Sequence, residues 1–231
     1  MEPELEQELI DYLAQFVTGQ RLQRIEEVLA WRTRYLTVLL EDVYQPHNAS
    51  AALRSCEIFG VQDVHVVELE NEFQPNLAIA MGAANWLTIK RYQDDDARAG
   101  LHEAAHTLRE QGYHLVAMTL HEDSIPIGEL SLEQPLALCF GTEEEGLTEE
   151  VHAIADSYVH LPMYGFTQSF NVSVTVALSL QALTHRLHDS DLTWRLSPQE
   201  RQQLKLEWLV NSIPRGEIVM REYARSLGVS L

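Results

Sequence analysis

The spacing of apolar residues changes near residue 35 of the chain. Up to residue 34, apolar side chains recur at intervals of three and four, which predicts two helices separated by Thr18-Gly19. These positions are Leu5, Leu9, Ile10, Leu13 and Phe16, then Leu22, Ile25, Val28 and Leu29. From residue 35 the apolar residues gather in short runs instead, which indicates that a different architecture begins there.

Six short apolar runs predict six strands. They read YLTVLLEDV, DVHVVEL, WLTIKRY, YHLVAMTL, PLALCFG and YVHLPM. Helical stretches at 49–59, 97–111 and 148–156 lie between them, and a longer one follows at 171–187. Such apolar strands, alternating with helices, predict an α/β fold in which helices cover both faces of a mostly parallel six-stranded sheet. Ligands of these sheets bind beyond the carboxyl ends of the strands, so the residues after each strand are candidates for a site.

The chain becomes helical again near its end. Ser197 and Glu200 have the spacing of a capping box with Pro198 between them, so a helix is predicted to start there. Pro214 and Gly216 interrupt it, and a last short helix is expected to follow. We therefore expect an N-terminal helical extension (1–34), an α/β domain (35–187) and a C-terminal helical extension (188–231).

The formal net charge of −19 alone argues against a nucleic-acid partner, because phosphate binding usually needs a basic face. The distribution of charge weakens this argument. Arg21, Arg24, Arg32 and Arg34 lie before residue 35, and a second group of basic residues begins at Arg186. A polyanion would therefore be bound mainly by the two ends of the chain.

Several classes of protein do not fit the sequence. No apolar run approaches the roughly 18 residues of a membrane span, and the acidic start MEPELEQELIDYL is unlike a signal peptide, so we expect a cytoplasmic protein without a membrane partner. Cys56 and Cys139 are too few for a disulfide scaffold. His102 and His106 lie four residues apart, but no third ligand is indicated, so no metal site is expected.

The stretch NASAALRSCEIFG follows the first predicted strand. Asn48 is placed to cap a helix that opens here, and Arg54 is expected within two turns on nearly the same side. A capping asparagine followed by a surface arginine is the simpler interpretation. An arginine with few basic neighbours is also suited to form a focused positive charge near a strand end.

The stretch CFGTEEEGLTEE follows another predicted strand. Its glycines allow the backbone to approach a ligand closely, and its carboxylates suit a cation such as an organic sulfonium. It is not a GxGxxG motif and lacks the lysine of a P-loop, so a dinucleotide or a triphosphate is a poor match. An acidic loop at a helix N-terminus is the alternative interpretation.

The stretch LPMYGFTQSFNVSVTV leaves the last predicted strand. Gly165 permits a turn, and either Ser169 or Asn171 is placed to cap the helix that follows. The first turns of that helix carry Val172, Val174, Thr175 and Val176. These β-branched residues have lower helix propensity, which indicates a tightly packed, buried segment.

In this order, N-x-x-A-x-x-R-S, G-T-E-x-x-G-L and L-P-M-x-G-x-x-x-S-F-N-V-S-V resemble the three motifs of the SpoU/TrmH family of RNA ribose 2′-O-methyltransferases, in the SPOUT superfamily. The resemblance covers about residues 20–187. The tail, with Trp194, Glu200, Trp208 and Ile218, is similar to the C-terminal extension of the tRNA branch. Two residues depart from the pattern: Phe170 stands where leucine is usual, and Gln45 where relatives often carry lysine.

The resemblance implies a deep trefoil knot in the α/β domain, a homodimer through the knot region, and S-adenosylmethionine bound in the knot. Cofactor contacts are then expected from Met118, Gly141, Thr142, Glu143, Leu161, Met163 and Phe170. The residues expected to take part in catalysis are Arg54, Asn48, Glu143, Ser169 and Asn171. RNA contacts are expected from Arg21, Arg24, Arg32, Arg34 and Arg54.

Among family members, enzymes that act on large-subunit ribosomal RNA commonly carry an extra N-terminal RNA-binding domain, whereas helical extensions at both ends resemble the enzymes that methylate guanosine 18 in the tRNA D-loop. We therefore expect tRNA as the substrate, with ribosomal RNA as the alternative. A non-catalytic RNA-binding knot protein is a further alternative, which the intact motif residues disfavour. A dinucleotide oxidoreductase lacks its glycine fingerprint here.

Overall fold

The computed structural model describes residues 1–231 except 44, 94–96, 143 and 230–231. The chain divides into two compact units. Thr33–Trp194 forms the α/β unit, and Met1–Arg32 together with Arg195–Leu231 forms the terminal unit. The two terminal segments, which were expected as separate extensions, therefore pack together in one unit.

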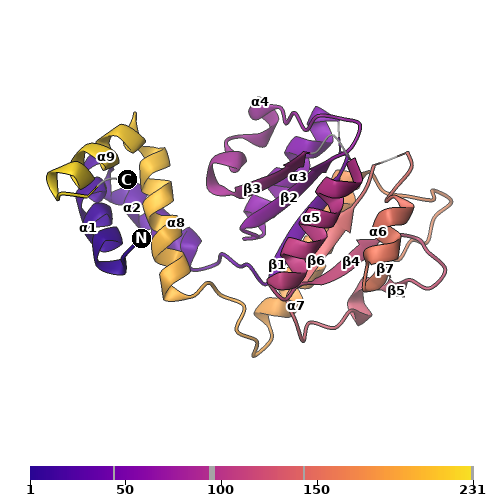
Figure 1. Ribbon diagram of the computed structural model, residues 1–231. Coiled ribbons are helices and arrows are strands. Elements are labelled where there is room, and N and C mark those ends of the chain that lie inside the picture. Colours follow the sequence, from indigo (N-terminus) through magenta and orange to yellow (C-terminus); the bar gives the residue numbers. More distant parts are fainter. Residues whose placement is uncertain (44, 94–96, 143, 230–231) are drawn as a thin grey trace. The chain divides into compact units, whose positions relative to one another are not determined.

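In the residues that the structure describes, the α/β unit is built on a parallel sheet of seven strands, so the expected number of six is wrong. The strands are β1 (Leu36–Glu41), β2 (Asp63–Glu68), β3 (Thr88–Gln93), β4 (His114–Met118), β5 (Ile125–Pro126), β6 (Leu136–Phe140) and β7 (Ser157–His160). Their order is β3-β2-β1-β6-β4-β7-β5, and every pair is parallel (Figure 1). The missed strand, β5, has two residues, too few to show a periodic pattern.

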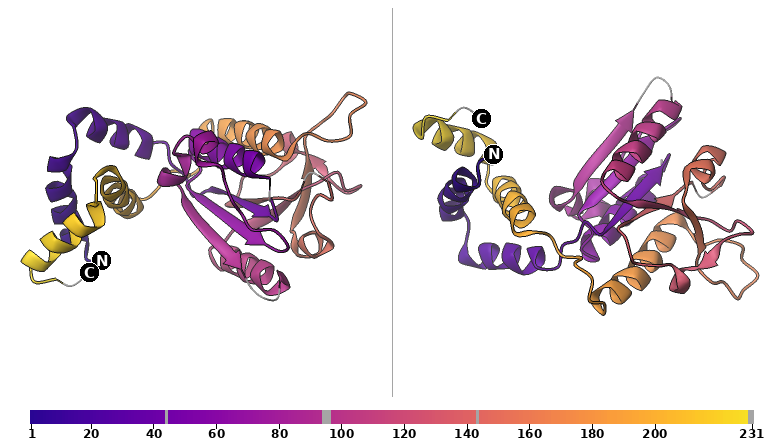
Figure 2. Two further views of the ribbon diagram at one scale, coloured as in Figure 1. Left: turned by 90° about the horizontal axis from the view of Figure 1, so that it is seen from above. Right: turned by 60° about the horizontal axis from the view of Figure 1, so that its bottom comes forward.

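Helices cover both faces of this sheet, as expected. Those of the α/β unit are α3 (Pro46–Ile58), α4 (Leu77–Ala80), α5 (Ala97–Glu110), α6 (Glu149–Ile154) and α7 (Val172–His188), with 3₁₀ turns at Ala83–Trp86 and Ile127–Glu129. Figure 2 shows α3 and α7 side by side on one face and α5 on the other. In β1, Val38 and Leu40 pack in the cluster under α3 and α7, and Leu39 packs under α5, because successive strand side chains point to opposite faces.

The first turns of α7 are only partly buried. Val172 and Val176 belong to the core under this helix, but Val174 is 42% exposed. The expectation that all the β-branched residues here are buried is therefore wrong for Val174. Residues four apart share a helix face, whereas a residue midway between them points to the opposite side.

The terminal unit is helical. It contains α1 (Pro3–Leu13), a 3₁₀ turn (Ala14–Phe16), α2 (Gly19–Leu29), α8 (Pro198–Ser212) and α9 (Gly216–Ser226). The predicted capping box of α8 is present: Glu200 N donates to Ser197 Oγ at 3.2 Å, and Ser197 N donates to Glu200 Oε2 at 2.8 Å. The ring of Tyr12 stacks on that of Tyr223 with centroids 3.7 Å apart, joining the two ends of the chain. None of the helices in the described ranges is both long and apolar enough to cross a bilayer.

Candidate functional site

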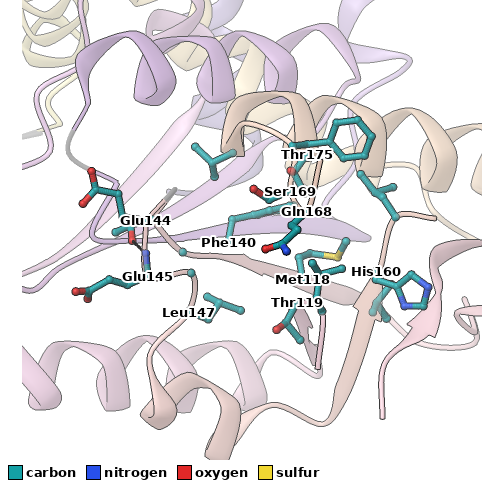
Figure 3. A pocket seen from close by; sticks show the side chains of 18 of the residues that line it. Met118, Thr119, Phe140, Glu144, Glu145, Leu147, His160, Gln168, Ser169 and Thr175 are labelled. Carbon is teal, nitrogen blue, oxygen red and sulfur yellow. Dashed lines mark hydrogen bonds between the residues drawn. The ribbon is translucent and has the colours of Figure 1, made fainter. Parts of the chain in front are cut away.

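A cavity of about 370 Å³ lies at the carboxyl ends of β4, β6 and β7. Its walls come from the end of β4, from the loop after β6 and from the segment that leads from β7 into α7. This is the edge of a parallel sheet at which ligands are expected, and the volume is in the range of small-molecule sites. Figure 3 shows Glu144 and Glu145 on one side, His160 on the opposite side, and Gln168 and Ser169 between them.

The cavity brings together every predicted cofactor residue that the structure describes. These are Met118, Gly141, Thr142, Leu161, Met163 and Phe170, and Ser169 joins them. Glu143, predicted for both cofactor binding and catalysis, lies outside the described residues. The structure adds Thr119, Leu120, Glu144, Glu145, His160 and Gln168 to the walls. Thr119 and Leu120 directly follow β4, a position that could have singled them out, whereas His160 ends β7 and carried no such signal.

The loop after β6 is a tight turn that only glycine permits at its first position. Thr142 N donates to Gly146 O at 3.0 Å, and Gly146 N donates to Thr142 O at 3.1 Å. A Cβ atom on Gly141 would collide with the Gly146 carbonyl group and with the backbone nitrogen of Leu147. Gly146 itself has a φ of 75°. The two glycines thus fold the loop back on itself and let its backbone form a wall of the cavity.

Asn48 and Asn171 meet at the N-termini of α3 and α7. Asn171 Nδ2 donates to Asn48 Oδ1 at 3.1 Å, and Asn48 Nδ2 donates to Gln45 Oε1 at 3.0 Å. Asn171, and not Ser169, caps α7, since Ser173 N donates to Asn171 Oδ1 at 2.9 Å. The expected cap by Asn48 is wrong because α3 already begins at Pro46, which makes Gln45 the N-cap residue.

Arg54 is exposed on α3 and does not line the cavity. Its guanidinium forms no hydrogen bond or ion pair with any residue that the structure describes. The expectation that Arg54 and Asn48 share a side of the helix is wrong, because Asn48 is 7% exposed and buried. Each residue turns an α-helix by about 100°, so residues six apart end roughly 120° away from each other.

The arginines expected to contact RNA have different environments. Arg21 and Arg24 are exposed on α2, where Arg24 also pairs with Glu27 at 3.4 Å. Arg34, in the α/β unit, is half-buried and pairs with Asp63 at 3.1 Å. Arg32 is fully buried with its guanidinium 5.1 Å from the ring centroid of Trp208, so the structure contradicts a direct RNA contact by Arg32. Packing on an indole ring stabilises such a cation.

The charges around the cavity are negative. The carboxylates of Glu144 and Glu145 are exposed at its rim. Cys139, in the neighbouring strand segment, offers no nucleophile because burial raises the pKa of its thiol to about 12. The arrangement suits binding of a compact ligand that has apolar parts and a positive charge.

Comparison with known proteins agrees with this geometry. The profile of the SpoU rRNA Methylase family matches residues 35–181. A tRNA (guanosine(18)-2′-O)-methyltransferase of Borreliella burgdorferi is 40% identical over 199 residues, which cover 86% of this chain and 88% of that protein. A 23S rRNA (guanosine-2′-O-)-methyltransferase of Vibrio parahaemolyticus is 30% identical over 167 residues, 71% of this chain and 64% of that protein. The crystal structure of a TrmH/SpoU tRNA modifying enzyme of A. aeolicus superposes with a TM-score of 0.73 at 28% identity, covering 84% of this chain and 98% of that one. The chain therefore belongs to the SpoU rRNA methylase family.

Proposed function

We propose that this protein transfers a methyl group from S-adenosylmethionine to the ribose 2′-hydroxyl of guanosine 18 in tRNA. The observation that carries the proposal is the cavity at the carboxyl ends of β4, β6 and β7, which all described cofactor-motif residues line. Membership of a methylase family supports the reaction, and the 40% identical relative named for guanosine 18 supports the substrate.

The cavity fits the proposed cofactor by its chemistry. Met118, Leu161 and Phe170 offer apolar surface for a planar base, and the backbone of the turn at Gly141 is open to close approach. The rim carboxylates of Glu144 and Glu145 favour a cationic ligand. When bound, S-adenosylmethionine supplies a methyl group on a positively charged sulfur.

Methyl transfer to a hydroxyl group needs in-line placement of the acceptor and help with its proton. Asn48 and Asn171, which hold each other at the ends of two helices, are proposed to orient the ribose, together with Ser169. For Arg54 we propose binding of a phosphate or stabilisation of the developing alkoxide, since a guanidinium stays protonated in proteins and is a poor base. Its exposed position on α3 leaves it accessible to RNA.

The proposal includes a homodimer and a trefoil knot in the 161–176 region. Val174 and Leu178 are 42% and 40% exposed on α7, an apolar surface that a second copy of the chain would cover. The exposed Arg21 and Arg24 of the terminal unit are proposed to contact the RNA phosphates, which compensates in part for the acidic composition. A tRNA substrate implies a cytoplasmic location.

Ribosomal RNA is the second candidate substrate. The relative named for 23S rRNA supports it, although this chain spans only 64% of that protein. The longer match to the relative named for guanosine 18, 88% of its length, favours tRNA.

A methyl-transfer assay with defined RNAs tests the proposal. Unmodified tRNA transcripts are incubated with labelled S-adenosylmethionine, and nucleoside mapping locates the label. We expect 2′-O-methylguanosine at position 18, and none in a transcript whose guanosine 18 is replaced by 2′-deoxyguanosine. Label in 23S rRNA alone would favour the second candidate, and RNA binding without transfer would indicate a non-catalytic protein.

A further inference from the structure

Glu41, the last residue of β1, is a buried carboxylate with a partner far along the chain. It is 1% exposed. Thr148 N donates to Glu41 Oε2 at 2.9 Å, and Thr148 Oγ1 donates to Glu41 Oε1 at 2.6 Å. Both carboxylate oxygens therefore accept hydrogen bonds from one residue, which lies 107 positions away in the sequence. Glu41 is not among the residues that line the cavity.

Thr148 is the residue at which the cavity loop ends. Gly141, Thr142, Glu144, Glu145, Gly146 and Leu147 all line the cavity. The start of this loop is fixed by β6, which pairs with β1 and β4. The loop ends at Thr148, whose hydroxyl donates to Glu41. Thr148 is also the N-cap residue of α6, because its hydroxyl accepts a hydrogen bond from Val151 N at 3.3 Å. Glu41 thus connects the end of the loop to a central strand of the sheet.

Burial of this carboxylate carries a cost. Burial raises the pKa of Glu41, while the two hydrogen bonds from Thr148 lower it in part, and the nearby Asp42 and Glu150 raise it further. A buried charge next to other carboxylates does not by itself favour folding, and an apolar side chain of similar size often serves stability as well. The position of Glu41 is therefore better explained by what its two oxygens hold.

We propose that Glu41 is a positioning residue for the donor: by holding Thr148, it fixes the wall of the cavity formed by residues 141, 142 and 144–147 and so sets the affinity for S-adenosylmethionine without touching it. The inference rests on the proposed function, because it names a determinant of the same site. A purely structural role for Glu41 is the rival explanation.

Glu68 provides a matched control for the purely structural explanation. It ends the adjacent strand β2, is 8% exposed, and also holds a loop, since Phe73 N donates to Glu68 Oε1 at 2.6 Å and Arg91 Nε donates to Oε2 at 3.0 Å. Glu68, Phe73 and Arg91 do not line the cavity. Glu68→Gln therefore makes the same chemical change at the end of the neighbouring strand, away from the donor.

The test measures binding of S-adenosylhomocysteine, the demethylated product, by calorimetry. Glu41→Gln should raise Kd by about tenfold, because the amide nitrogen cannot accept one of the two hydrogen bonds and the other no longer ends on a carboxylate, whereas Glu68→Gln should leave Kd within about twofold. The KM for S-adenosylmethionine should rise in parallel while kcat at saturating donor changes little. Thr148→Val should weaken binding similarly, and Thr148→Ser, which keeps the hydroxyl, should restore it.

A double-mutant cycle tests whether Glu41 acts through Thr148. The Glu41→Gln/Thr148→Val variant should bind no more weakly than the weaker of the two single variants, because both remove one connection. Amide hydrogen exchange without any ligand should be faster at residues 144–148 in Glu41→Gln than in the wild type. The inference would be overturned if Kd and amide exchange were unchanged in Glu41→Gln, or if Glu68→Gln weakened binding equally. Fully additive effects of Glu41→Gln and Thr148→Val on Kd would also overturn it. A different result would contradict the proposed function instead: the wild type binds no S-adenosylhomocysteine, and the amides of residues 144–148 still exchange faster in Glu41→Gln than in the wild type.

Discussion

Asn171 donates a hydrogen bond from Nδ2 to Oδ1 of Asn48 at 3.1 Å, across 123 positions of the sequence. The same asparagine caps α7 through its Oδ1, and Asn48 is held in turn by Gln45. The bond therefore joins the N-termini of two neighbouring helices with one side chain. Two of the three sequence motifs meet at this point, beside the segment that lines the cavity.

Loss of this bond should affect turnover more than stability. Asn171→Ala removes the cap of α7 and the bond to Asn48, and should destabilise the fold by about 1 kcal/mol, as is usual for a lost cap. Turnover should fall by more than about tenfold, because the ribose is no longer oriented. Ser197→Ala, which removes the cap of α8 in the terminal unit, is the control. Urea unfolding should show a similar loss of stability for this variant, and its turnover should be normal. Equal turnover of both variants would argue against a role for Asn171 in orienting the substrate.

Arg54 should be required for transfer but not for donor binding. It is exposed on α3 and does not line the cavity, so Arg54→Ala should keep the Kd for S-adenosylhomocysteine and lower kcat by more than about a hundredfold. Arg109→Ala serves as the control, because Arg109 contacts Ile154 and Asp156 on the other face of the sheet. Retained transfer in Arg54→Ala would exclude both the phosphate and the alkoxide role.

Gly141 should tolerate no side chain. In Gly141→Ala the new methyl group would meet the Gly146 carbonyl group, so the turn must open and donor affinity should fall by more than about tenfold. Gly128→Ala is the matched control, because a Cβ at position 128 has no neighbour within 4 Å. Calorimetry measures the affinity of both variants for S-adenosylhomocysteine. Normal affinity of Gly141→Ala would contradict the prediction, because the wall of the cavity could then adapt to a side chain.

His65 should make the α/β unit sensitive to mild acid. Burial, with a smaller effect of Lys90, lowers the pKa of His65 to about 4, and its Nδ1 lies 2.8 Å from Tyr92 Oη. Since the folded pKa is below the usual 6.5, stability is fully present above pH 6.5 and is lost as the pH falls toward 4. The loss should be on the order of 3 kcal/mol, from the size of the shift.

Urea unfolding between pH 7 and pH 4 measures this effect. His65→Gln should reduce the pH dependence over this range, whereas His106→Gln should not, because His106 is 73% exposed on α5. If the free energy of unfolding depended on pH in the same way in the wild type and in His65→Gln, His65 would not be the source of the acid sensitivity.

Much of the fold could be predicted because apolar periodicity reflects burial directly. In β6, Leu136, Leu138 and Phe140 face one cluster and Ala137 and Cys139 the other, so the run LALCF is apolar throughout and reads as a strand covered on both faces. The two-residue β5 has no such pattern. The packing of both chain ends in one unit depends on contacts between distant residues, such as Tyr12 and Tyr223, which no local pattern reveals.

The site was predictable where residues follow a strand and not where tertiary packing decides. Gly141 and Met163 follow strand ends, and both line the cavity. The burial of Arg32 against Trp208 was not foreseeable, because an arginine in a helical extension is usually exposed. The expected position of Arg54 is wrong for a different reason, since the helical rotation over six residues alone separates it from Asn48.

A crystal structure of the protein with S-adenosylhomocysteine would show directly where the methyl donor binds. We predict the ligand in the cavity between the loop after β6 and the segment from Leu161 to Phe170, with its adenine against apolar side chains and its sulfur directed toward the Asn48–Asn171 pair. A ligand bound elsewhere, or no ligand at millimolar concentration, would contradict the assignment of this cavity to the methyl donor.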